Sequence, residues 1–131
     1  MVFGTFDGLH KGHLSFLKQA KNFTENSFLI ASIARDSNVV KIKGKKPNFS
    51  EKERLLLVKK CKYIDKAVLS GKLKYLPHIL KEKPDIIALG YDQKAYVDNL
   101  KKDLKNKGIL IKIVRLKPYK AKIYKTHLLR K

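Results

Sequence analysis

Apolar stretches of strand length alternate along this chain with stretches of helical periodicity, and this alternation limits the possible folds more than any other feature. The runs Phe28–Ala34 and Asp85–Leu89 are almost continuously apolar, as expected for strands that are buried on both faces. Before the first run, Leu14, Leu17 and Ala20 recur at the spacing of one helix face. The alternation predicts a parallel β-sheet with helices on both faces and right-handed crossovers.

The expected elements are strands and helices in strict alternation, followed by a helical tail. We expect strands at Val2–Thr5, Phe28–Ala34, Lys66–Leu69, Asp85–Leu89 and Ile109–Leu116. We expect helices at Lys11–Asn22, from the capping box at Ser50 to about Lys62, at Tyr75–Lys83 and at Ala95–Asn106, a basic loop at Arg35–Phe49, and a terminal helical turn near Thr126–Lys131. This order indicates an α/β, Rossmann-like three-layer sandwich with a five-stranded parallel sheet, in a single domain over residues 1–131. A ligand is expected beyond the carboxyl ends of the strands.

Composition argues against several classes of protein. No stretch of the 131 residues approaches the roughly 18–20 apolar residues that a membrane span needs. No signal peptide is visible at the start of the sequence. Cys61 is the one cysteine, so no disulfide forms within the chain, and no Cys/His cluster has zinc spacing. We therefore expect a cytoplasmic protein that is not associated with a membrane.

The formal net charge of +20 first suggests a nucleic-acid-binding protein. The 31 basic residues include only four arginines, however, and the planar guanidinium is the group that reads base edges best. A solvated coat of lysines explains the charge at least as well. A basic nucleic-acid-binding module therefore remains only as the non-enzymatic alternative.

The turn after the first expected strand carries the chemistry. It reads Gly4-Thr5-Phe6-Asp7, and His10-Lys11-Gly12-His13 follows two residues later. It matches neither the dinucleotide fingerprint nor the P-loop. We expect Gly4 to let the backbone approach a ligand and Gly12 to leave space beside the first helical turn. Two imidazoles on one face, beside the free amides of a helix N-terminus, would suit a phosphate.

These residues resemble the signature of the cytidylyltransferase-like branch of the nucleotidyltransferases, whose fold carries an HxGH motif. The resemblance continues through Arg54, Tyr63-Ile64-Asp65, Gly90-Tyr91-Asp92-Gln93 and Lys125-Thr126, and so spans nearly the whole chain. It implies nucleotidyl transfer, in which an acceptor phosphate attacks the α-phosphorus of a nucleoside triphosphate and pyrophosphate leaves. Such an enzyme works by aligning two anions and neutralising the charge that builds up on the transferred phosphate.

The resemblance also implies a role for each motif residue. The residues expected to be catalytic are His10, His13, Lys43 and Lys45. The residues expected to bind the nucleotide are Gly4, Thr5, Phe6, His10, His13, Gly90, Asp92 and Thr126. Arg54 and Lys45 would hold the acceptor phosphate. A divalent cation, Mg²⁺, would bridge the triphosphate, and no residue is assigned as its ligand.

Two segments favour one group within this branch. Residues 84–93 and 43–54 look most similar to archaeal-type FAD synthases, which adenylylate FMN, so ATP and FMN are the expected substrates. The main alternative is a glycerol-3-phosphate cytidylyltransferase, but Gly90-Tyr91-Asp92-Gln93 departs from the Gly-Asp-Asp-Trp-like element of that group. CTP in place of ATP, and pantetheine-phosphate or sugar-phosphate acceptors, stay open. A compact α/β chain of this size could also form a homodimer.

Overall fold

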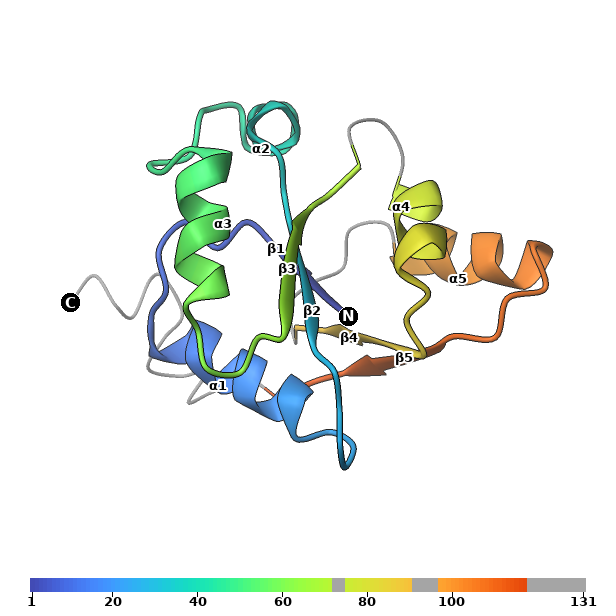
Figure 1. Cartoon of the computed structure of the whole chain (residues 1–131). Coiled ribbons are helices and arrows are strands. Elements are labelled where there is room, and N and C mark those ends of the chain that lie inside the picture. Colours follow the sequence, from blue (N-terminus) through green and yellow to red (C-terminus); the bar gives the residue numbers. More distant parts are fainter. Residues whose placement is uncertain (72–74, 91–96, 118–131) are drawn as a thin grey trace.

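The computed structural model describes residues 1–71, 75–90 and 97–117 (Figure 1). Strands and helices alternate along these residues. The strands are β1 (Val2–Gly4), β2 (Ile30–Ile33), β3 (Lys66–Leu69), β4 (Ile86–Leu89) and β5 (Lys112–Arg115). The helices are α1 (Lys11–Lys21), α2 (Asp36–Lys43), α3 (Glu51–Lys59), α4 (Tyr75–Glu82) and α5 (Val97–Asn106). The expected helical turn near Thr126–Lys131 lies outside the described residues.

The strands form one five-stranded sheet in the order β3-β2-β1-β4-β5, and every neighbouring pair is parallel. Helices α1 and α3 lie on one face of this sheet, and α4 and α5 lie on the other (Figure 1). The predicted α/β architecture, a parallel sheet between two helical layers, is therefore confirmed. All strands point the same way, so the turns that follow β1, β2 and β4 meet at one edge of the sheet.

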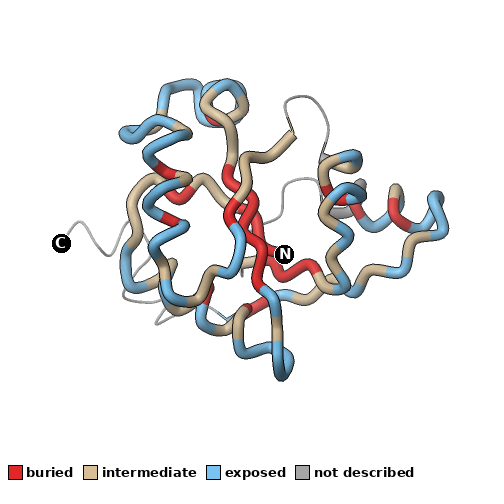
Figure 2. The backbone as a smooth tube through the Cα atoms, in the orientation of Figure 1, coloured by how far each residue is buried: buried red, intermediate tan, exposed pale blue. Residues whose placement is uncertain are grey.

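Each face of the sheet has its own apolar core. On the face covered by α1 and α3, Leu17 and Val58 pack with Ala31 of β2. On the face covered by α4 and α5, Ile79 and Leu100 pack with other buried side chains. Figure 2 shows the buried residues concentrated along the central strands, with the exposed residues on the outer sides of the helices and on loops. The core therefore fixes the strands, and the carboxyl edge is left to the loops.

Helix α2 occupies part of the segment that was expected to be a basic loop, so that prediction is wrong for residues 36–43. Asp36 places an acid in the first turn, where the helix dipole favours negative charge. Val39 is the buried residue of this helix. Gly44 ends it in the left-handed conformation, at φ 74°, and its N–H donates to the Val40 carbonyl at 2.8 Å. One buried residue among exposed lysines gives too weak a periodicity to reveal a helix.

Arg54 of α3 lies fully buried behind the carboxyl edge of the sheet. Its Nη1 donates to the carbonyls of Thr5, at 2.8 Å, and Ala34, at 2.7 Å, which follow β1 and β2. Its Nε donates to the Phe49 carbonyl at 3.0 Å, and its Nη2 pairs with Asp36 Oδ1 at 2.6 Å. One guanidinium thus ties together two strand ends, the start of α2 and the loop before α3.

This environment corrects the expectation that Arg54 binds the acceptor phosphate. The side chain has 0% exposure, and its donors are directed at main-chain carbonyls and at one carboxylate. Its carboxylate partner is Asp36, at the start of α2. Arg54 is a structural residue that shapes the edge on which the motif residues stand.

Replacing Arg54 by lysine should strongly destabilise the fold. An ammonium keeps the charge but cannot span three carbonyls and a carboxylate, so buried acceptors lose their donors. We expect Arg54→Lys to lower the free energy of unfolding, measured by urea denaturation, by about 3 kcal/mol. Arg35→Lys is the control, because Arg35 is partly exposed and its Nη1 lies 3.6 Å from Glu51. A loss at Arg54 no larger than at Arg35 would contradict the structural role.

Candidate active site

The two motif histidines form a stacked pair at the N-terminus of α1. Their ring centroids lie 3.8 Å apart and the ring planes are inclined by 28°. His10 is the N-cap residue, and His13 occupies the third helical position. The Nδ1 of His10 accepts from the Gly12 N–H at 2.9 Å and the His13 N–H at 3.3 Å, while the Nδ1 of His13 accepts from the His10 N–H at 3.2 Å. The pair is a capping box in which both partners are imidazoles.

This arrangement decides which ring nitrogen can donate. Because each Nδ1 accepts from the main chain, a neutral ring carries its proton on Nε2. The expectation that free amides of the helix end would face a phosphate is wrong for Gly12 and His13, because the His10 ring occupies their N–H groups. The imidazoles take the place of these amides as donors. The Nε2–H group of each neutral ring can donate a hydrogen bond to an anion.

Burial sets the charge of His13. Burial in this turn, together with electrostatic repulsion from His10 and Lys43, lowers the pKa of His13 from 6.5 to about 4. The ring is therefore neutral at physiological pH. A neutral imidazole remains a hydrogen-bond donor through Nε2, so it can stabilise a phosphate oxygen without transferring its proton.

Two glycines make room for rings of the turn itself. A Cβ at Gly12 would lie 2.7 Å from Cε1 of His10, so Gly12 gives the capping ring its space, as expected. A Cβ at Gly4 would lie 2.8 Å from the ring of Phe6. Gly4 was expected to let the backbone approach a ligand, but what lies against it here is the Phe6 ring. Phe6 is buried, adopts a positive φ of 52° and lies 5.9 Å from the His13 ring between centroids.

The end of α2 reaches the same turn. The positive charge of Lys43, the last residue of α2, acts on the pKa values of both Asp7 and His13. Asp7 accepts hydrogen bonds from the segment that follows α2, and within that segment Lys45 is exposed. The structure therefore brings Lys43 beside the histidine turn and places Lys45 on the segment attached to it.

The other motif residues lie at the end of β4 or outside the described residues. Strand β1 pairs with β4 through Val2 and Ala88, so Gly90, just after β4, stands on the same edge as Gly4. The Gly90 carbonyl accepts from Nη1 of Arg115 at 2.7 Å. Asp92 and Thr126, both expected at the nucleotide, lie outside the described residues.

Three contacts of this site cannot be predicted from the local pattern of the sequence. Asp36 pairs with an arginine of the next helix, 18 residues away. The Asp7 carboxylate bonds residues more than forty positions further along the chain. Phe6 adopts a positive φ, and its ring lies against Gly4. The spacing of residues in a motif does not show which distant residues pair. It also does not show whether a residue adopts a positive φ angle.

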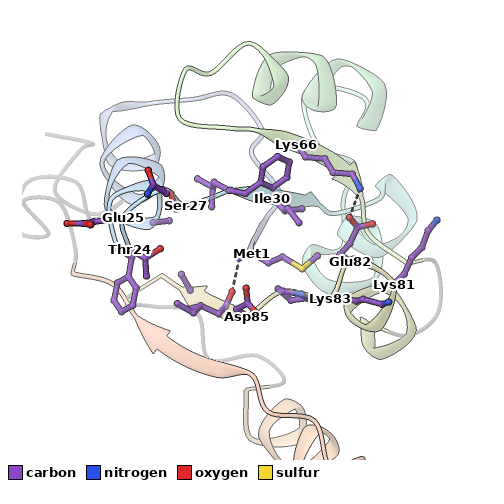
Figure 3. A pocket seen from close by; sticks show the side chains of 18 residues that line it. Met1, Thr24, Glu25, Ser27, Ile30, Lys66, Lys81, Glu82, Lys83 and Asp85 are labelled. Atoms are coloured by element: carbon purple, nitrogen blue, oxygen red, sulfur yellow. Dashed lines mark hydrogen bonds and ion pairs between the residues drawn. The ribbon is translucent and has the colours of Figure 1, made fainter.

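A cavity of about 690 Å³ lies at the opposite, amino edge of the sheet (Figure 3). It is bordered by the turn after α1 and by the segment between α4 and β4. A buried Glu82 carboxylate on its wall pairs with the Nζ of Lys66 at 2.7 Å. None of the motif histidines or lysines lines it. It is therefore separate from the candidate site.

Among the described residues, no group of three or more histidine, cysteine, aspartate or glutamate side chains could hold a metal ion. Across the same residues, no helix is long and apolar enough to cross a bilayer.

The low pKa of His13 should make stability depend on pH. The unfolded chain takes up a proton at His13 below about pH 6.5, whereas the folded chain does so only near pH 4. Stability is therefore lost as pH falls through this window. His13→Gln keeps the capping box but does not titrate. Between pH 7 and pH 5, the free energy of unfolding should fall by about 1 kcal/mol more in the unmodified chain than in His13→Gln, after allowance for solvent screening.

Urea denaturation of both proteins at both pH values measures this difference. The pKa of His78 is also lowered, but its contribution is common to the two proteins and cancels. Equal pH dependence in the two proteins would mean that His13 titrates normally in the folded state.

Comparisons with known proteins agree with this geometry. The family model described as "Cytidylyltransferase-like" matches residues 1–131. The chain is 37% identical to the FAD synthase of Thermoplasma volcanium, covering 100% of this chain and 90% of that protein. It is 45% identical to the FAD synthase of Methanothermus fervidus, covering 92% and 83%. It is 42% identical to the FAD synthase of Korarchaeum cryptofilum, covering 88% and 79%.

A solved structure also resembles the chain closely. The crystal structure of a protein titled as the lipopolysaccharide core biosynthesis protein from Thermoplasma volcanium GSS1 superposes with a TM-score of 0.82. The two share 39% identity, over 91% of this chain and 95% of the other. With its HxGH turn, its parallel sheet and a family model that matches along the whole sequence, this chain belongs to the cytidylyltransferase-like family.

Proposed function

We propose that this chain is an FAD synthase, which transfers the adenylyl group of ATP to the phosphate of FMN. The observation that carries the proposal is the stacked His10/His13 pair, whose Nε2 donors stand at the carboxyl edge of the sheet. Several archaeal relatives named FAD synthase, 37–45% identical over most of this chain, support the choice of ATP and FMN.

The chemistry needs positioned donors more than a nucleophilic side chain. An FMN phosphate oxygen attacks the α-phosphorus of ATP, the bond to the bridging oxygen breaks, and pyrophosphate leaves with the electron pair. The attacking oxygen is already anionic, so no serine or cysteine nucleophile is required. The enzyme holds the two anions in line and stabilises the charge on the equatorial oxygens.

The motif residues take the following parts in the proposal. His10 and His13 donate from Nε2 to the α- and β-phosphate oxygens, and Thr5 and Phe6 border the same phosphates at the end of β1. Lys43 and Lys45 neutralise the triphosphate, and Lys45 also meets the acceptor phosphate, because Arg54 is buried. The proposed contacts to the nucleotide from Gly90, Asp92 and Thr126 complete the site.

In this proposal, Mg²⁺ binds to the nucleotide. Among the described residues no cluster of carboxylates or histidines offers a metal site, and both Asp7 oxygens accept main-chain N–H groups. A cation held by triphosphate oxygens and water fits this donor set better than one held by the protein. We therefore propose that the substrate is the Mg²⁺ complex of ATP. A homodimer and a cytoplasmic location remain predictions.

A second acceptor class has one specific observation in its favour. The solved relative is titled as a lipopolysaccharide core biosynthesis protein. We keep a sugar phosphate, one of the acceptors that the sequence leaves open, as an alternative to FMN. Both present a phosphate monoester to the same edge, so the chemistry at the α-phosphorus would be unchanged.

A matrix of substrates tests the proposed function. Pyrophosphate release would be measured with ATP or CTP against FMN, glycerol-3-phosphate, phosphopantetheine and a sugar phosphate, each with and without Mg²⁺. We expect release with ATP, FMN and Mg²⁺ together, with stoichiometric FAD formation followed by chromatography. Cytidylylation of glycerol-3-phosphate without any FAD would overturn the proposal.

Removing either imidazole should slow the chemical step without unfolding the protein. His10→Ala and His13→Ala should each lower kcat by about 100-fold, the usual effect of losing one donor to a charged transition state. His10→Asn is the matched variant, because its amide oxygen still caps α1. It should keep stability within about 1 kcal/mol while kcat stays low. A kcat within tenfold of the unmodified enzyme in both alanine variants would refute the assigned roles.

A further inference from the structure

Asp7 joins the histidine turn to the segment between α2 and α3. Its Oδ2 accepts from the Asn48 N–H at 2.7 Å, and its Oδ1 accepts from the Phe49 N–H at 2.8 Å. One carboxylate thus takes two consecutive main-chain donors, more than forty residues away in sequence. The N-cap position of α1 is filled by His10, so Asp7 does not cap this helix.

The segment that Asp7 holds is the lysine loop, defined here as Gly44–Phe49. At its start, Gly44 closes α2 in the left-handed conformation. At its end, the Phe49 carbonyl accepts from Arg54, and the Phe49 ring lies 3.8 Å from where a Cβ of Gly8 would stand. Lys45 and Lys46 are exposed between these two anchors. The loop is therefore fixed at both ends and presents its cations in the middle.

The charge of Asp7 is unfavourable for the proposed ligand. Partial burial raises the pKa of its carboxyl, but the two N–H bonds and the positive charges of Arg54 and Lys43 outweigh this and leave the pKa below its ordinary value. Asp7 is therefore an anion beside a site proposed to bind a triphosphate, which it repels. A residue that only contributed charge would weaken binding there. A residue that orients cations would strengthen it.

We propose that Asp7 is a positioning residue, whose carboxylate holds the lysine loop against the His10/His13 pair so that Lys45 meets the triphosphate. This inference rests on the proposed nucleotidyl transfer. It assigns Asp7 neither to the metal nor to the helix cap. It also predicts that the effect of Asp7 on substrate binding acts through Lys45.

Asp7→Asn tests the anchor directly, because an amide offers one oxygen and no charge to the two N–H groups. The first measurement is the rate of tryptic cleavage after Lys45 in the folded protein, and we expect it to rise about tenfold, in line with a loosened charge-assisted contact. Glu53→Gln is the matched control: it also removes one acid near the loop, but it keeps the Ser50 capping box and should leave cleavage unchanged.

The second measurement is KM for ATP, at saturating FMN. We expect Asp7→Asn to raise KM about tenfold with a smaller change in kcat, since the lost contact acts on bound substrate and transition state alike. In a Lys45→Ala background, the same change should raise KM less than about twofold, because the cation that Asp7 orients is gone. Glu53→Gln should leave KM unchanged.

Three results would overturn the proposal. A lower KM in Asp7→Asn, with normal cleavage, would mean that Asp7 acts only by repulsion. Full recovery at raised Mg²⁺ would make it a metal ligand. Equal effects with and without Lys45 would make its role purely structural.

If Asp7→Asn fails to fold, Asp7→Glu keeps the charge but misplaces the oxygens, and it should raise both the cleavage rate and KM by an intermediate factor. Normal values for both in a folded Asp7→Glu protein would count against the anchor. If the unmodified chain makes no FAD, the proposed function fails, while the cleavage rate still tests the anchor.

Discussion

The buried guanidinium of Arg54 is the interaction on which the carboxyl edge depends. The carbonyls of Thr5 and Ala34 follow strands whose ladders have ended, so they need donors from elsewhere in the fold. Arg54 supplies these donors, and Asp36 balances its charge. Burying a charge without such partners would destabilise the fold by roughly several kcal/mol. The burial of Arg54 and its four contacts therefore depend on one another. The histidine turn begins at Thr5, whose carbonyl this network holds.

Helix N-termini at this edge are satisfied by side chains in reciprocal pairs. His10 and His13 cap α1, and Ser50 and Glu53 cap α3 within one helical turn. Asp36 and Glu51 do the same between two helices: Asp36 Oδ2 accepts from the Glu51 N–H at 3.2 Å, and Glu51 Oε1 accepts from the Asp36 N–H at 2.9 Å. Acidic side chains stand at the N-termini of α2 and α3, whereas two imidazoles cap α1, whose first turn has no acidic residue. The capping pair of α1 therefore adds no negative charge to the positive end of this helix.

Local signals predicted the parts of the fold that local interactions determine. The strand Lys66–Leu69 was located to the residue, and the Ser50 capping box formed as expected. The helix Asp36–Lys43 was missed, because Glu51 and Arg54 hold its start from outside. The paired histidines were located correctly as a motif. The burial of Arg54 and the hydrogen bonds of Asp7 to the lysine loop depend on contacts between residues that are tens of positions apart. The local spacing of residues does not predict such contacts.

The order of the strands in the sheet also bears on the order in which the two halves of the chain fold. Strands β1, β2 and β3 pair with their neighbours in sequence, whereas β4 joins β1 across more than eighty residues, between Val2 and Ala88. Every described group of the histidine turn, the lysine loop and the Arg54 network precedes Lys60. Contacts close in sequence form faster than distant ones. During synthesis, the half that carries the histidine turn therefore emerges first, and we expect β4 and Gly90 to join the sheet later.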